Sequence, residues 1–120
     1  MTILNLFKFV KEQVTFPADH VIFKEDDTGD FAYVVIEGEV ELTYHGHLLE
    51  TVGPGGLLGE MTLIDNQTRS ATAKTKTEVK AVVFDRNRFV FMVQETPWFA
   101  LEVMKIMADR LRHEHEKIAD

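Results

Sequence analysis

The spacing of turn-forming residues is the feature that most constrains how this chain can fold. Three pairs that tolerate turn geometry recur at short intervals, namely Gly29 with Asp30, Glu37 with Gly38, and His45 with Gly46. Such intervals fit strands of about five to eight residues joined by tight hairpins. This regular spacing of turns predicts an antiparallel β-barrel or sandwich.

The segments between these turns have the periodicity of strands. Apolar and polar residues alternate over 40–44, which is typical of a strand with one buried face. Segment 31–36 is apolar on both faces and predicts a central strand. The same reasoning predicts strands over 69–74 and 79–84.

Helical patterns precede and follow the strands. Apolar residues recur at roughly helical spacing over 4–13, which predicts a short amino-terminal helix. Asp85 can cap a helix after the last strand, and Thr96 with Pro97 begins a final helix. We therefore expect an α+β fold, an antiparallel β-barrel or jelly roll flanked by helices, in a single domain over residues 1–120.

The charge balance argues against several classes of function. The chain has 13 Lys and Arg against 20 Asp and Glu, so its net charge is 13 − 20 = −7, and DNA or an anionic membrane is a poor partner. We expect a cytoplasmic location, because no apolar run is long enough to span a membrane and no signal-peptide pattern is present. The absence of cysteine excludes disulfides and thiolate chemistry.

Segment 53–72 combines several features of an anion site. Its glycines let the backbone approach a ligand closely, and a short helical turn starting near Glu60 presents unpaired amide protons. Arg69 adds a planar fork of donors that suits a phosphate. A carboxylate beside a phosphate needs a reason, and Glu60 can accept from a sugar hydroxyl while Arg69 keeps it ionised. These residues predict a ligand that holds a sugar and a phosphate in one compact ring.

This segment resembles the phosphate-binding cassette of the cyclic nucleotide-binding domain family. Gly59, Glu60, an apolar turn and the run 69–72 stand in the order and spacing of that family, with no insertion between the glutamate and the arginine. Turn glycines elsewhere in the chain are similar too. The resemblance covers roughly residues 14–112.

The resemblance implies a role for each cassette residue. Glu60 takes the ribose 2′-hydroxyl, Arg69 takes the cyclic phosphate, and backbone amides near Thr62 and Ser70 complete the cradle. Serine at position 70 favours cyclic AMP over cyclic GMP in this family. The expected ligand-binding residues are Leu58, Gly59, Glu60, Met61, Thr62, Arg69, Ser70 and Ala71.

The resemblance also implies a regulatory sensor and not an enzyme. In the family the last helix covers the base, and either Arg110 or Arg112 is expected to reach the pocket from it. This helix has more apolar positions than one packed face requires. We expect the signal to pass by movement of the final helices to an effector protein in trans, or to a second copy through the last helix.

Two alternatives remain open on the sequence alone. One is a protein-interaction scaffold with the same fold and no bound nucleotide, in which Glu60 and Arg69 form a structural ion pair. The other is a cupin-type metal enzyme with His45, His47 and Glu50 as ligands, although His45 looks like part of a hairpin turn. We expect no metal and no resident cofactor.

Overall fold

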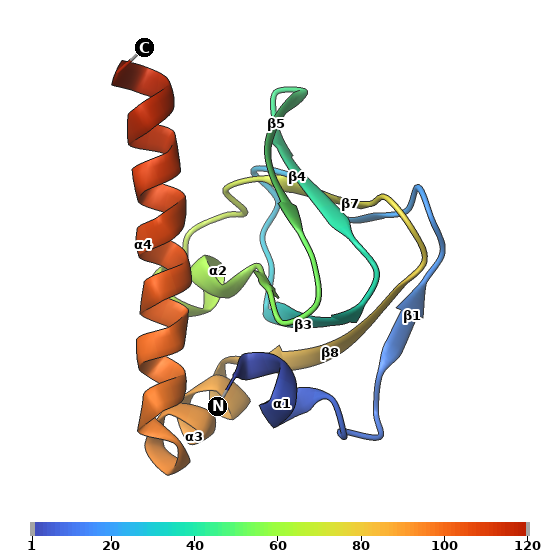
Figure 1. Ribbon diagram of the computed structural model, residues 1–120, viewed down its shortest axis with the longest axis vertical. Coiled ribbons are helices and arrows are strands. Elements are labelled where there is room, and N and C mark those ends of the chain that lie inside the picture. The colour runs from blue at the N-terminus through green and yellow to red at the C-terminus, as the bar shows by residue number, and fades with distance from the viewer. Residues whose placement is uncertain (1, 120) are drawn as a thin grey trace.

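The strands of the described chain form two four-stranded antiparallel sheets, which lie on the right in Figure 1. The structure is a computed structural model that describes the backbone of residues 2–119 and the side chains of residues 2–112. One sheet holds, in order, β1 (Val14–Phe16), β8 (Val79–Asp85), β3 (Phe31–Glu37) and β6 (Leu57–Leu58). The other holds β2 (Val21–Phe23), β7 (Thr72–Thr75), β4 (Val40–Tyr44) and β5 (His47–Val52).

This arrangement confirms the predicted α+β fold with an antiparallel jelly roll. Strand β3 lies inside its sheet between β8 and β6, as its apolar sequence predicts. In β4, Val40 and Leu42 are buried, whereas Tyr44 is exposed because the strand ends there at the β4–β5 hairpin. The alternation of the sequence thus sets which residues face the interior.

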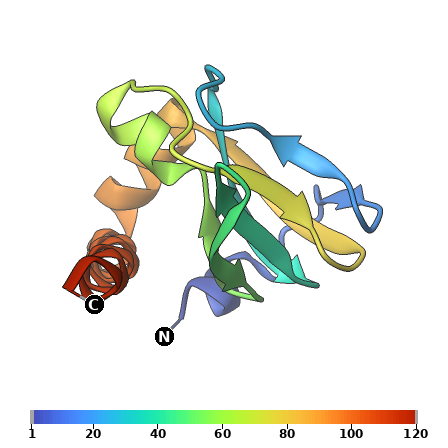
Figure 2. The ribbon, with the colours of Figure 1, turned by 90° about the horizontal axis from the view of Figure 1, so that it is seen from above.

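The described part of the chain also has four helices, of which three lie to one side of the sheets and the short amino-terminal one lies beneath the strands in Figure 2. They are α1 (Ile3–Phe7), α2 (Glu60–Asp65), α3 (Arg86–Glu95) and α4 (Pro97–Ala119). The Asp85 carboxylate accepts from the Arg88 amide at 2.8 Å, and Pro97 is the first residue of α4, so both predicted helix starts are confirmed. Within the described part of the chain, no helix is both long and apolar enough to cross a membrane.

Two boundaries differ from the sequence prediction. Helix α1 ends at Phe7 instead of residue 13, because the chain turns there and the Gln13 side chain donates to the Val10 carbonyl at 3.1 Å. The strand predicted from residue 69 begins only at Thr72, because the Arg69 amide donates to the Asp27 carbonyl in a facing loop at 2.8 Å. In both places a hydrogen bond outside the regular helix or strand pattern coincides with the changed boundary.

The buried residues form two clusters that divide the core. One fills the space between the two sheets and includes Val35, Val40 and Ala73. The other packs the helices onto the first sheet, and in it Phe7 of α1 lies between Phe84 and Phe99, with ring centroids 5.9 and 5.8 Å away. Aromatic packing therefore anchors the beginning of α4, and the rest of the helix extends past α2 (Figure 1).

Candidate functional site

Helix α2 carries the acidic residue of the predicted cassette into the protein interior. Gly59, which precedes the helix, has φ of 76° and ψ of 10°, a left-handed conformation that glycine adopts at little cost. No side chain in the described part of the protein caps the amino terminus of α2. Glu60, its first residue, is only 1% exposed. The glycine therefore turns the chain so that a carboxylate is buried at the start of a short helix.

A cavity of about 360 Å³ lies between α2, the second sheet and α4. It is lined by Phe23, Leu42, Leu49, Glu50, Gly59, Glu60, Met61, Thr62, Arg69, Ser70, Ala71, Asp109 and Arg110. Seven of the eight residues expected from the sequence thus meet at one cavity. Its volume falls within the range of small-molecule sites, roughly 300–1,000 Å³.

Leu58 is the expected site residue that does not line this cavity. It is completely buried in β6 and packs in the cluster between the sheets, together with Leu42 and Ala71. A contact between Leu58 and a ligand does not fit this geometry, because its side chain points into the core behind the cavity wall. Its role here is to support two residues that do line the cavity.

Arg69 is a buried cation whose hydrogen-bond partners are neutral. It is 5% exposed, and it donates to the carbonyl oxygens of Gly59 at 3.2 Å and Phe31 at 2.8 Å. Its guanidinium also lies 4.3 Å from the centre of the Phe23 ring. The Nε–H group is buried and has no hydrogen-bond partner among the residues that the structure describes. A buried donor without a partner is costly unless a ligand satisfies it.

Two glycines provide the space that the Arg69 guanidinium occupies. A Cβ atom added to Gly29 or to Gly59 would overlap guanidinium atoms of Arg69. The turn containing Gly29 and the glycine before α2 lie far apart in sequence, yet both border the same side chain. Any larger residue at either position would displace the arginine.

Burial shapes the electrostatics of Arg69. It lowers the pKa of Arg69, and the nearby Tyr33, Asp30, Glu60 and Asp27 side chains oppose that effect. An arginine nevertheless remains protonated at neutral pH. The site therefore holds a permanent positive charge that is poorly solvated, which favours an anion beside it.

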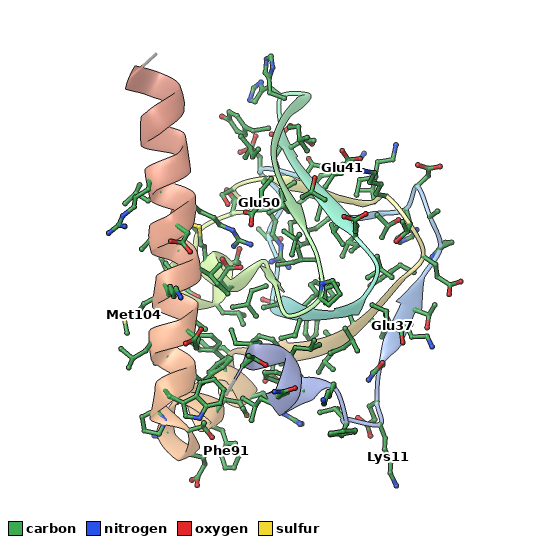
Figure 3. All side chains as sticks on the ribbon, in the orientation of Figure 1. Lys11, Glu37, Glu41, Glu50, Phe91 and Met104 are labelled. Atoms are coloured by element: carbon green, nitrogen blue, oxygen red, sulfur yellow. The ribbon has the colours of Figure 1, made fainter. Side chains whose placement is uncertain are left out.

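Arg110 of α4 binds Glu60 in a different way. Its Nη1 donates to Glu60 Oε1, its Nε donates to Glu50 Oε2 at 2.7 Å, and its Nη2 donates to the Leu57 carbonyl at 2.6 Å. Figure 3 labels Glu50 on β5, one of the strands near α4. Burial would lower the pKa of Arg110, but the carboxylates of Glu60 and Glu50 outweigh it and raise that pKa. Arg110 is thus a fully charged cation paired with two anions.

These contacts correct the idea of a structural ion pair between Glu60 and Arg69. The counter-ion that binds Glu60 is Arg110, whereas Arg69 donates to carbonyl oxygens. Of the two arginines expected to reach the pocket from the last helix, Arg110 lines the cavity and Arg112 is exposed.

Several cavity residues were not expected from the sequence. Phe23, Leu42 and Leu49 form an apolar wall, but in the sequence they look like any core residue of a strand. The sequence pattern indicates a role for Glu50 only as a metal ligand, and it indicates no role for Asp109. Both depend on where α4 lies against β5, which no local pattern reveals.

The residues of the cupin alternative do not form a metal centre. His45 and His47 are exposed at the β4–β5 hairpin, and the His45 amide donates to the Glu25 carboxylate at 3.0 and 3.1 Å. Glu50 is paired with Arg110. Among the residues with described side chains, no group of three or more metal-ligating residues gathers.

Comparison with known proteins identifies the family. Residues 13–96 match the family model described as the cyclic nucleotide-binding domain. That match extends over more than half of the 120 residues. The chain belongs to the cyclic nucleotide-binding domain family, and it is a cyclic nucleotide-binding regulatory domain.

Individual relatives agree with this assignment. The CRP-like cAMP-activated global transcriptional regulator of Mycobacterium tuberculosis is 32% identical in an alignment 114 residues long, which covers 91% of this chain and 51% of that protein. The catabolite activator protein of Thermus thermophilus has a TM-score of 0.78 and 29% identity, over 98% of this chain and 55% of that one. A cAMP-bound EAL enzyme has a TM-score of 0.66 and 30% identity, over 90% of this chain and 30% of that one. The chain spans about half the length of the curated relatives it matches.

Proposed function

We propose that this domain is a non-enzymatic sensor that binds one cyclic mononucleotide in the cavity, with cyclic AMP preferred over cyclic GMP. The observation that carries the proposal is the buried Arg69 guanidinium, which has neutral partners and one unsatisfied N–H group. A cyclic phosphate in the cavity supplies the missing anion, and charge-assisted hydrogen bonds from a guanidinium are worth about 1.5–3 kcal/mol each.

The remaining cavity residues suit the rest of a nucleotide. Glu60 is acceptor-only when ionised and can bind a ribose hydroxyl. The apolar wall that contains Phe23, Leu42 and Leu49 can cover a base. Residues 1–120 are proposed to act as one binding unit, with contacts to the ligand from Gly59, Met61, Thr62, Ser70 and Ala71 as well.

The preference for cyclic AMP rests on one residue and on one relative. Ser70 lines the cavity, and serine at this place is common in family members that bind cyclic AMP. The mycobacterial relative is named as cAMP-activated. The EAL enzyme was solved with cAMP and also with cGMP bound, so it does not favour either nucleotide. A cyclic dinucleotide is about twice as large as a mononucleotide and is not expected to fit the cavity.

The proposed output is a change in the position of α4, which contributes Asp109 and Arg110 to the cavity wall. The helix also exposes Leu101, Met104 and Leu111, which are spaced by three and seven residues and so share one side. This side is the proposed contact with an effector protein in trans or with a second copy of the chain. The proposed place of action is the cytoplasm, without DNA or membrane as a direct partner.

Thermal unfolding with added nucleotides tests the proposal. A ligand at about one hundred times its Kd adds roughly 2.7 kcal/mol to the free energy of unfolding. We expect the melting temperature of the wild type to rise more with cyclic AMP than with cyclic GMP at equal concentrations, and to stay constant with cyclic di-GMP. Arg69→Ala should remove the rise, whereas Arg88→Ala, which changes an exposed arginine of α3, should keep it.

A wild type that melts at the same temperature with every nucleotide would favour the interaction scaffold. A rise that persists in Arg69→Ala would place the ligand elsewhere in the domain.

A further inference from the structure

Arg110 connects α4 to three other elements through one side chain. Each guanidinium nitrogen donates to a different element: Nε to Glu50 of β5, Nη1 to Glu60 of α2 and Nη2 to the Leu57 carbonyl of β6. The side chain is 20% exposed. The position of α4 along the cavity therefore depends on these contacts.

The two carboxylates differ in how much they need Arg110. Glu60 is 1% exposed, so its charge requires a partner in the protein. The Glu50 side chain is 37% exposed, so water can solvate its charge without any partner. Glu50 therefore does not need Arg110 to stabilise its own charge, and the main effect of the pair is to hold Arg110 in place.

The cavity exists while all three contacts are made. The cavity of about 360 Å³ is present in the same structure in which Arg110 binds Glu50 and Glu60. A ligand can thus occupy the cavity without breaking them, and once inside it lies against Arg110 and Asp109 of α4. Loosening α4 would uncover that ligand.

We propose that Glu50 is a positioning residue that holds Arg110, and through it α4, over the filled cavity, and so slows the release of bound nucleotide. The inference rests on the proposed function, because it concerns the same cavity. Glu50 acts mainly on the dissociation rate, since loss of a partner from a partly buried charge pair mostly changes how long a complex lasts. Glu60 is unsuitable for a test because it is expected to bind the ribose directly.

The test measures release of a fluorescent cyclic AMP analogue labelled on the base, so that the ribose hydroxyl stays free. The labelled complex is mixed with excess unlabelled cyclic AMP in a stopped-flow instrument. We expect Glu50→Gln to release the probe about threefold to tenfold faster than the wild type, with little change in the association rate. Glu41→Gln, the same substitution on the adjacent strand β4 and outside the cavity, should release it at the wild-type rate.

Two further variants separate a positioning effect from a general loss of structure. Glu50→Asp keeps the charge at a shorter reach and should give a rate between those of the wild type and Glu50→Gln. In an Arg110→Gln background, Glu50→Gln should cause no additional acceleration, because the cation that it holds is gone.

The possible failures are distinguishable. If the wild type binds the probe but Glu50→Gln releases it at the wild-type rate, the inference is wrong and the proposed function stands. Equal acceleration in the Arg110→Gln background would also overturn the inference. If the wild type does not bind the probe at all, the proposed function itself falls.

Discussion

The two arginines of the cavity carry the same charge but meet different partners. Arg69 comes from the loop before β7 and donates to two carbonyl oxygens, with its Nε–H unsatisfied. Arg110 comes from α4 and donates to two carboxylates and one carbonyl. The charge of Arg110 is therefore already neutralised, whereas that of Arg69 remains available for an anionic ligand.

The largest expected effect concerns the stability of the nucleotide-free protein. Arg110→Ala leaves the carboxylate of Glu60 buried without its partner, which should lower the free energy of unfolding by about 3 kcal/mol. Arg112→Ala removes an exposed arginine from the same helix and should change stability by no more than about 0.5 kcal/mol. Urea denaturation measures both values. If both variants lost an equally small free energy of unfolding, the role of Arg110 as the partner of Glu60 would be contradicted.

A second, smaller effect concerns the space around Arg69. Gly59→Ala combines a left-handed backbone with an overlap against the guanidinium, so nucleotide affinity should fall about tenfold and stability by about 1–2 kcal/mol. Gly46→Ala also has positive φ, but nothing lies within 4 Å of the added Cβ. Gly46→Ala should therefore lose stability and retain affinity in a calorimetric titration. If both variants lost affinity, the loss in Gly59→Ala could not be assigned to overlap with the Arg69 guanidinium.

The smallest expected effect is a change in pH dependence. The lowered pKa of Arg69 belongs to a group that stays protonated at neutral pH, so wild-type affinity should be constant between about pH 6 and 9. In Arg69→Lys the same burial lowers the pKa of an amine, which loses its proton more readily. Its affinity should therefore fall as the pH rises toward 9. A profile for Arg69→Lys as flat as that of the wild type would indicate that position 69 is not buried in the bound state.

Much of the fold follows from local sequence patterns. The strand alternation, the Asp85 cap and the Pro97 helix start are decided by neighbouring residues, and the structure has them where they were predicted. The predicted end of α1 and the predicted start of β7 were wrong, because hydrogen bonds from the Gln13 side chain and from the Arg69 amide set these boundaries.

The site was predictable only in part. Seven of the residues that line the cavity, including Glu60 and Arg69, lie within the short segment 59–71. The roles of Glu50, Asp109 and the apolar wall could not be predicted, because they depend on how α4 lies against the second sheet. The partner of Glu60 illustrates this limit, since Arg110 stands 50 residues away in the sequence.

The different roles of the two arginines can be tested by following their side-chain Nε–H signals with nuclear magnetic resonance while cyclic AMP is added. Arg69→Lys and Arg110→Lys assign the two signals. We expect the Arg69 signal to shift strongly as the phosphate binds beside its guanidinium, whereas the Arg110 Nε–H, which already donates to Glu50, should shift little. A shift of the Arg110 signal alone, with the Arg69 signal unchanged, would contradict this expectation.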